Sequence, residues 1–84
     1  MTYQVNLKRS AEKELDALQA NLRERIIKHL LTLEENPHPA RSKKLQGQES
    51  YRLRVGDYRV LYSVDDQTKQ IMIIAIGHRR EVYR

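Results

Sequence analysis

The sequence predicts a two-layer α+β fold in which a helical hairpin packs on one face of a mostly antiparallel sheet. Three observations lead to this prediction. An alternating segment opens the chain, apolar residues at helical spacing follow it, and strand-like runs separated by short turns complete the order β-α-α-β-β-β. The chain has 84 residues with no internal repeat and no linker, so we expect residues 1–84 to form a single domain.

The first half of the chain is expected to form one strand and two helices. Residues 3–7 alternate in polarity, as a half-buried strand does. Ser10 is placed to cap the first helix, and Asn21 with Glu24 resembles a capping box for the second, which Pro37 ends. Each helix has one apolar face, formed by Ala11, Leu15 and Leu18 in the first and by Leu22, Ile26, Leu30 and Leu33 in the second.

The second half is expected to form a hairpin and a third strand. Residues 40–49 are polar and are predicted to form a loop, and residues 50–55 and 58–64 then form a hairpin. Gly56 at the first turn position suits a type II′ turn. Residues 70–77 are apolar on both faces, which predicts an interior strand. Regular alternation would place Ile71, Ile73 and Ala75 on one face and Met72, Ile74 and Ile76 on the other.

The composition limits the chemistry and the partners. The chain has no cysteine, which excludes disulfides, thiolate metal sites and a thiol nucleophile. His29 and His38 have no neighbours at metal-ligand spacing, so we expect neither a metal nor another cofactor. The formal charge of +5 favours polyanionic partners, although it is also compatible with a role in solubility alone. Without a signal peptide or a membrane-spanning run, we expect a cytoplasmic protein that does not enter the membrane.

The register of the predicted hairpin gives the sharpest functional inference. A two-residue turn pairs Val55 with Tyr58, Arg54 with Arg59, Leu53 with Val60 and Tyr51 with Tyr62. Arg52, Arg54 and Arg59 then share one face, opposite the apolar one. Like charges directly opposite each other cost roughly 0.2–1 kcal/mol, a cost that an anion bound between the guanidinium groups removes.

The alternative interpretation of these arginines is a solvated sheet face, with their stems covering apolar surface. That interpretation suits any single arginine better, but three on one small face favour an anion site. Lys43 and Lys44 lie in the polar segment before the hairpin, where we expect solvated charge that adds electrostatic attraction for an RNA backbone.

The C-terminal segment brings groups suited to phosphodiester cleavage by a 2′-hydroxyl. Residues 77–84 contain an imidazole, guanidinium groups and a phenol directly after the last predicted strand. Cleavage needs a base for the hydroxyl proton, cations for the charge on phosphorus and an acid for the departing oxygen. Arginine suits the second role, because its pKa above about 12 makes it a poor base. Tyr83 and His78 are the candidates for proton transfer, and a purely structural role is an equal alternative for His78.

Three motifs in this order resemble the RelE/ParE superfamily of toxin–antitoxin toxins, on the RelE side. They are YRLRV at 51–55, GDYRVLY at 56–62 and IGHRREVY at 76–83, and the resemblance covers nearly the whole chain. It implies a metal-independent endoribonuclease that enters the ribosomal A site, cuts mRNA there and inhibits translation. It also implies a cognate RelB-like antitoxin that neutralises the toxin.

The resemblance also implies a role for each matching residue. Arg52, Arg54 and Arg59 match cations that bind and stabilise the scissile phosphate. Arg79 matches the residue assigned to the leaving group, and Tyr83 matches the general base. Here the chain has arginines where the best-known RelE has lysines on the same strand, and two fewer residues between the glycine and the tyrosine. His78 is therefore retained as an alternative base.

Two further functions share this fold and charge. One is a ParE-like toxin that inhibits DNA gyrase without cutting RNA, and the other is a non-catalytic nucleic-acid-binding module. The combination of Arg59, Arg79 and Tyr83 distinguishes the nuclease, since gyrase binding does not require it. A binding module would more often carry exposed aromatic residues for base stacking.

Overall fold

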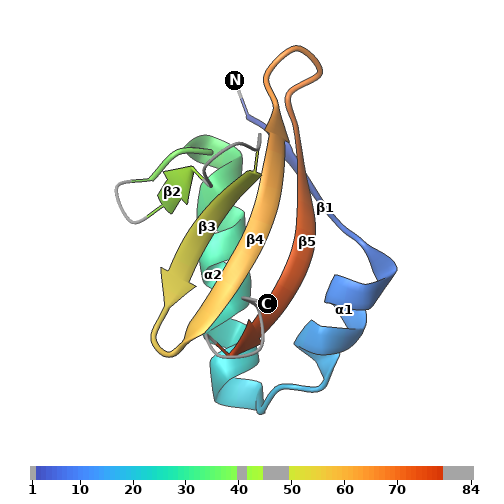
Figure 1. The fold of residues 1–84 in the computed structure, drawn as a ribbon, viewed down its shortest axis with the longest axis vertical. Helices are drawn as coiled ribbons and strands as arrows, with labels where there is room; N and C mark the ends of the chain where they lie inside the picture. Colours follow the sequence, from blue (N-terminus) through green and yellow to red (C-terminus); the bar gives the residue numbers. More distant parts are fainter. Residues whose placement is uncertain (1, 40–41, 45–49, 79–84) are drawn as a thin grey trace.

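The computed structural model describes residues 2–39, 42–44 and 50–78, which form the expected two-layer α+β fold (Figure 1). The elements are β1 (Gln4–Leu7), α1 (Arg9–Asp16), α2 (Ala20–Glu35), β2 (Ser42–Lys44), β3 (Ser50–Val55), β4 (Tyr58–Asp65) and β5 (Gln70–His78). The predicted order is confirmed, with one additional strand, β2, after the helices. Neither α1 nor α2, the helices in the described ranges, is long and apolar enough to span a membrane.

The five strands form one sheet in the order β1-β5-β4-β3-β2. The pair β1–β5 is parallel, and the other three pairs are antiparallel, so the prediction of a mostly antiparallel sheet is confirmed. The apolar strand β5 is interior, as predicted, between β1 and β4. Both helices cover the same face of the sheet, with α2 behind β3 and β4 in the view of Figure 1. Within the described ranges, no helix covers the other face of the sheet.

The core lies between the helices and the covered face of the sheet. Its buried residues are Ala11, Leu15, Ile26, Leu30, Leu33, Leu53, Val55, Val60, Tyr62, Ile71, Ile73 and Ile76. Burial of one large apolar side chain stabilises a fold by about 1.5–3 kcal/mol, so this cluster holds the layers together. The predicted apolar faces of both helices are confirmed, with Leu18 and Leu22 packed at the margin of the core.

The strand β2 corrects the prediction that residues 40–49 form a loop. Within this segment the structure describes residues 42–44, which pair antiparallel with β3. The strand has three residues, Ser-Lys-Lys, and it therefore shows no alternation of apolar and polar residues. Its place in the sheet comes from backbone pairing at an edge, where short lysine-bearing strands are common.

A β-bulge corrects the predicted faces of β5. The register of β4 against β5 shifts between Leu61 and Tyr62, so that Ala75 lies opposite Leu61 and Ile73 lies opposite Tyr62. Ile74 is the extra residue, and the shift turns Ile76 to the buried face and Ala75 to the open face.

The side-chain caps expected for both helices are not formed. α1 begins at Arg9 after Lys8, and α2 begins at Ala20 after Gln19, and neither preceding residue makes a side-chain cap hydrogen bond. Ser10 and Asn21 therefore lie inside the first turns. The reason for α1 is visible in the sheet, because the Lys8 N–H donates to the Ile73 carbonyl at 3.0 Å. This bond keeps Lys8 extended, and the helix starts directly after it.

Candidate nucleic-acid interface

The β3–β4 hairpin has the register that the sequence predicts. Val55 pairs with Tyr58, Arg54 with Arg59, Leu53 with Val60 and Tyr51 with Tyr62. Gly56 has a φ of 60°, and the φ of Asp57 is not positive. A positive φ at the first turn position alone is the type II′ geometry, which suits the right-handed twist of paired strands. The turn therefore determines which residue of β3 faces which residue of β4.

The arginines of this hairpin lie on the open face of the sheet. Leu53 and Val55 are buried under the helices, so alternation along β3 turns Arg52 and Arg54 the other way. Arg59 is paired with Arg54 and shares its face. Arg54 is exposed, whereas Arg52 and Arg59 are half-buried, and the Nε atom of Arg59 is buried. The guanidinium groups of two neighbouring strands thus emerge on the same side.

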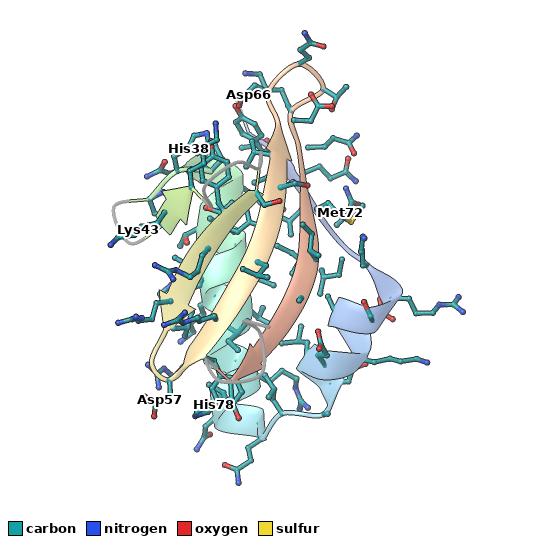
Figure 2. The ribbon with its side chains drawn as sticks, in the orientation of Figure 1. His38, Lys43, Asp57, Asp66, Met72 and His78 are labelled. Atoms are coloured by element: carbon teal, nitrogen blue, oxygen red, sulfur yellow. The ribbon has the colours of Figure 1, made fainter. Side chains whose placement is uncertain are left out.

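The strand β2 adds a fourth cation that sequence reasoning treated as loop charge. Lys43 pairs with Arg52 and therefore lies on the same face, at the edge of the sheet (Figure 2). We call Lys43, Arg52, Arg54 and Arg59 the cationic face. Lys44 pairs with Tyr51 and belongs to the other side of the sheet by alternation. No sequence signal separates the two lysines, because their orientation depends on the backbone pairing of β2.

The surroundings of the cationic face are small or apolar on the strands beside it. Arg52 lies opposite Leu61, and Arg59 lies opposite Gly77, which has no side chain. Cations beside apolar surface are screened less than cations in bulk water, which strengthens their attraction for an anion. The arrangement suits phosphate, since each guanidinium group can donate two parallel hydrogen bonds to its oxygens.

His78 is not brought to the cationic face by the sheet register. It pairs with Tyr58, and the two rings meet edge to face with centroids 5.6 Å apart. Tyr58 lies opposite Val55, on the side that faces the helices. His78 therefore lies at the end of β5, near the β3–β4 turn but on the side away from the arginines (Figure 2). The other two catalytic candidates, Arg79 and Tyr83, lie outside the described residues.

An aromatic cluster supports the other end of β3. Tyr51 stacks on Tyr62 with centroids 5.6 Å apart, and His38 lies 4.7 Å from the Tyr51 ring. The Tyr62 hydroxyl donates to the Pro37 carbonyl at 2.9 Å, and burial raises the pKa of this phenol. These contacts hold β3 against β4 and the segment that follows α2. They fix the strands that carry the cationic face.

A hollow of about 750 Å³ lies near this cluster and the β4–β5 turn, and it is less suited to an anion. Its lining includes Lys44 and Tyr51 but also the carboxyl groups of Asp65 and Asp66. Hydrogen bonds from Thr68 lower the pKa of Asp65, so this group carries its negative charge at neutral pH. No group of three or more potential metal-binding side chains occurs among the residues that the structure describes.

Comparisons with known proteins agree on one family. A family model described as "ParE toxin of type II toxin-antitoxin system, parDE" matches residues 5–83. An Escherichia coli protein described as a RelE-like toxin is 34% identical over 82 residues, covering 94% of this chain and 85% of that protein.

Solved structures of RelE toxins have the same fold. The RelE–RelB complex from Pyrococcus horikoshii OT3 matches with a TM-score of 0.86 and 34% identity, covering 96% of this chain and 99% of that chain. The isolated E. coli RelE toxin matches with a TM-score of 0.81 and 30% identity, covering 96% and 90%.

The fold and the matches define a toxin of a type II toxin–antitoxin system, built as two helices on a five-stranded sheet. The chain belongs to the RelE/ParE superfamily.

Proposed function

We propose that this toxin is a ribosome-dependent endoribonuclease that cuts mRNA in the A site and inhibits translation. The observation that carries the proposal is the register pair Arg54–Arg59, flanked by Arg52 and Lys43 on the same open face. Four cations on one small surface are suited to bind a polyanion, and the resemblance to the RelE endoribonucleases makes RNA the polyanion to test. In this proposal residues 1–84 act as a single toxin domain.

The proposed reaction is an attack of the RNA 2′-hydroxyl oxygen on the adjacent phosphorus. The bond from this oxygen to phosphorus forms and the bond from phosphorus to the 5′-oxygen breaks, which leaves a 2′,3′-cyclic phosphate and a 5′-hydroxyl. Arg59 is suited to stabilise the pentacoordinate phosphorus, because its half-buried position weakens solvent screening of its charge. Arg52, Arg54 and Lys43 would hold the flanking backbone.

The proton-transfer roles are assigned by resemblance, with Tyr83 as base and Arg79 at the leaving group. Lysine and arginine have pKa values far above neutral, so the cationic face by itself holds no good proton acceptor. With the ring of His78 against Tyr58, Tyr83 is the stronger candidate. We infer weak cleavage of naked RNA, because positioning by the ribosome has to complete so sparse a site.

The proposed antitoxin partner is a RelB-like protein in the cytoplasm. The P. horikoshii RelE relative was solved in complex with RelB, and this chain carries a charge of +5 that favours an acidic partner. The absence of cysteine fits a reducing compartment.

Primer extension on a reporter mRNA tests the proposed function. The wild-type toxin is expected to produce ribosome-dependent cuts, and Arg59→Ala is expected to abolish them while the protein stays folded. Arg9→Ala is the matched control, because Arg9 is an exposed arginine at the start of α1. Unchanged cutting by Arg59→Ala would remove the proposed site, and equal cutting without ribosomes would remove the ribosome requirement.

The second candidate function is inhibition of DNA gyrase, as in ParE toxins. It is favoured by one observation, the match of residues 5–83 to a ParE family model. Growth arrest with intact mRNA, together with induction of the DNA-damage response, would support it. Arrest with mRNA cut in the A site would exclude it as the main activity.

A further inference from the structure

Arg25 lies beneath the tip of the hairpin that carries the arginines. It comes from the second turn of α2, which begins at the same end of the molecule as the β3–β4 turn (Figure 1). Its guanidinium nitrogens would lie 3.6 and 3.8 Å from a β-carbon added to Gly56. The positive φ of the turn favours glycine at this position, and a β-carbon there would be in ordinary van der Waals contact with Arg25.

The position of Arg25 extends the positive charge around the hairpin tip. The pair Arg54–Arg59 is separated from the turn by one register pair, Val55–Tyr58. A strand rises about 3.3 Å per residue, so the Arg54 backbone lies roughly 7 Å from Gly56. Arg25 thus adds a guanidinium group on the order of 10 Å from the Arg54 backbone, on the other side of the turn.

The environment of Arg25 leaves its guanidinium group available to a ligand. The side chain is exposed, and it makes no hydrogen bond or ion pair with the residues that the structure describes. Gly56, beside the guanidinium group, offers no charge to it. Asp57, the other turn residue, is exposed and is the acidic group next to this position.

We propose that Arg25 contacts an RNA phosphate two to three nucleotides away from the phosphate held at Arg54 and Arg59. This inference rests on the proposed function, since it requires RNA on the cationic face. The spacing follows from about 10 Å of separation and a rise of about 3.4 Å per nucleotide in a stacked strand. The strand then passes over the β3–β4 turn. Asp57 repels the backbone at that crossing and limits affinity.

RNA binding by the full chain tests this assignment. The probes are 2′-O-methyl RNAs of two and ten nucleotides, which cannot be cleaved by 2′-hydroxyl attack. Binding is followed by fluorescence anisotropy over a range of salt. Arg25→Gln is expected to weaken binding of the ten-nucleotide RNA about two- to fivefold, as for an exposed ion pair. The slope of log K against log salt should fall by about 0.7, the value for one phosphate contact on a single strand.

The control variants separate this proposal from the proposed function. Arg25→Lys should restore most of the salt slope, Asp57→Asn should tighten binding, and Arg9→Gln should leave binding as in the wild type. The two-nucleotide RNA should bind Arg25→Gln and wild type alike, because its one internal phosphodiester cannot occupy both sites. Equal effects on the two lengths, or Arg25→Gln behaving like Arg9→Gln, would overturn the role of Arg25. The proposed function is tested separately by Arg54→Ala. RNA binding by this variant equal to that of the wild type would overturn the proposed function rather than the role of Arg25.

A purely structural role for Arg25 predicts a different pattern. Arg25 would then support the turn by packing on Gly56, and its replacement would lower the melting temperature without changing the salt slope. The proposal expects a melting temperature within a few degrees of the wild type together with the reduced slope. A lower melting temperature with an unchanged slope would contradict it.

Discussion

Replacement of Arg54 by glutamine should stabilise the fold while weakening RNA binding. Arg54 lies directly opposite Arg59 in the hairpin, and like charges in that position are destabilising by roughly 0.2–1 kcal/mol. Arg54 is exposed, so its loss removes little packing. The free energy of unfolding should therefore rise by about this amount at low salt. For a domain of this size the gain corresponds to about 1–8 °C in melting temperature.

Urea unfolding at low salt and at 1 M salt measures this effect. The Debye length falls from about 10 Å at 0.1 M to about 3 Å at 1 M, so the gain should largely disappear at high salt. Arg9→Gln, which removes the same charge from an exposed helical site, should show a smaller change. If Arg54→Gln destabilises the protein at low salt, or if its effect is independent of salt, the opposed arginines do not repel each other as proposed.

Two further predictions concern the support of the site. Tyr62→Phe removes the hydroxyl group that donates to the buried Pro37 carbonyl. Urea unfolding should show a free energy of unfolding lower by about 1–3 kcal/mol, and an unchanged value would mean that this hydrogen bond does not stabilise the fold. Hydrogen bonds from Thr68 and Gln67 lower the pKa of the Asp65 carboxyl group in the folded state. The contribution of Asp65 to stability is therefore complete above its pKa in the unfolded chain, near 3.9, and is lost as the pH falls through its lower pKa in the folded protein. Asp65→Ala should accordingly be less stable than wild type at pH 6, with the difference shrinking below pH 4, and a difference that grows on acidification would contradict this sign.

The hairpin and its arginines were predictable because their causes are local. A two-residue turn beginning with Gly56 sets the register, and a period of two then assigns Arg52 and Arg54 to one face. The helical faces followed from spacing in the same way. The packing of both helices on one face of the sheet was also predictable, because each helix has a single apolar face.

The features that sequence reasoning missed depend on contacts between distant segments. Lys43 joins the cationic face only because β2 pairs with β3, and this pairing uses the backbone. Ile76 turns inward because of a bulge opposite Leu61 and Tyr62, which the apolar run of β5 conceals. Tertiary hydrogen bonding sets the start of α1 more strongly than the capping preference of Ser10. The proposed roles of the C-terminal residues Arg79 and Tyr83 remain predictions.

The most direct test of the central claim is an NMR titration of the arginine Nε–H signals with an uncleavable 2′-O-methyl RNA of four nucleotides. Convergence of the guanidinium groups on one phosphodiester predicts saturable shifts at Arg52, Arg54 and Arg59 with a common dissociation constant, while Arg9 stays unchanged. Shifts spread evenly over all arginines, or confined to residues away from β3 and β4, would contradict the assignment of this face to RNA.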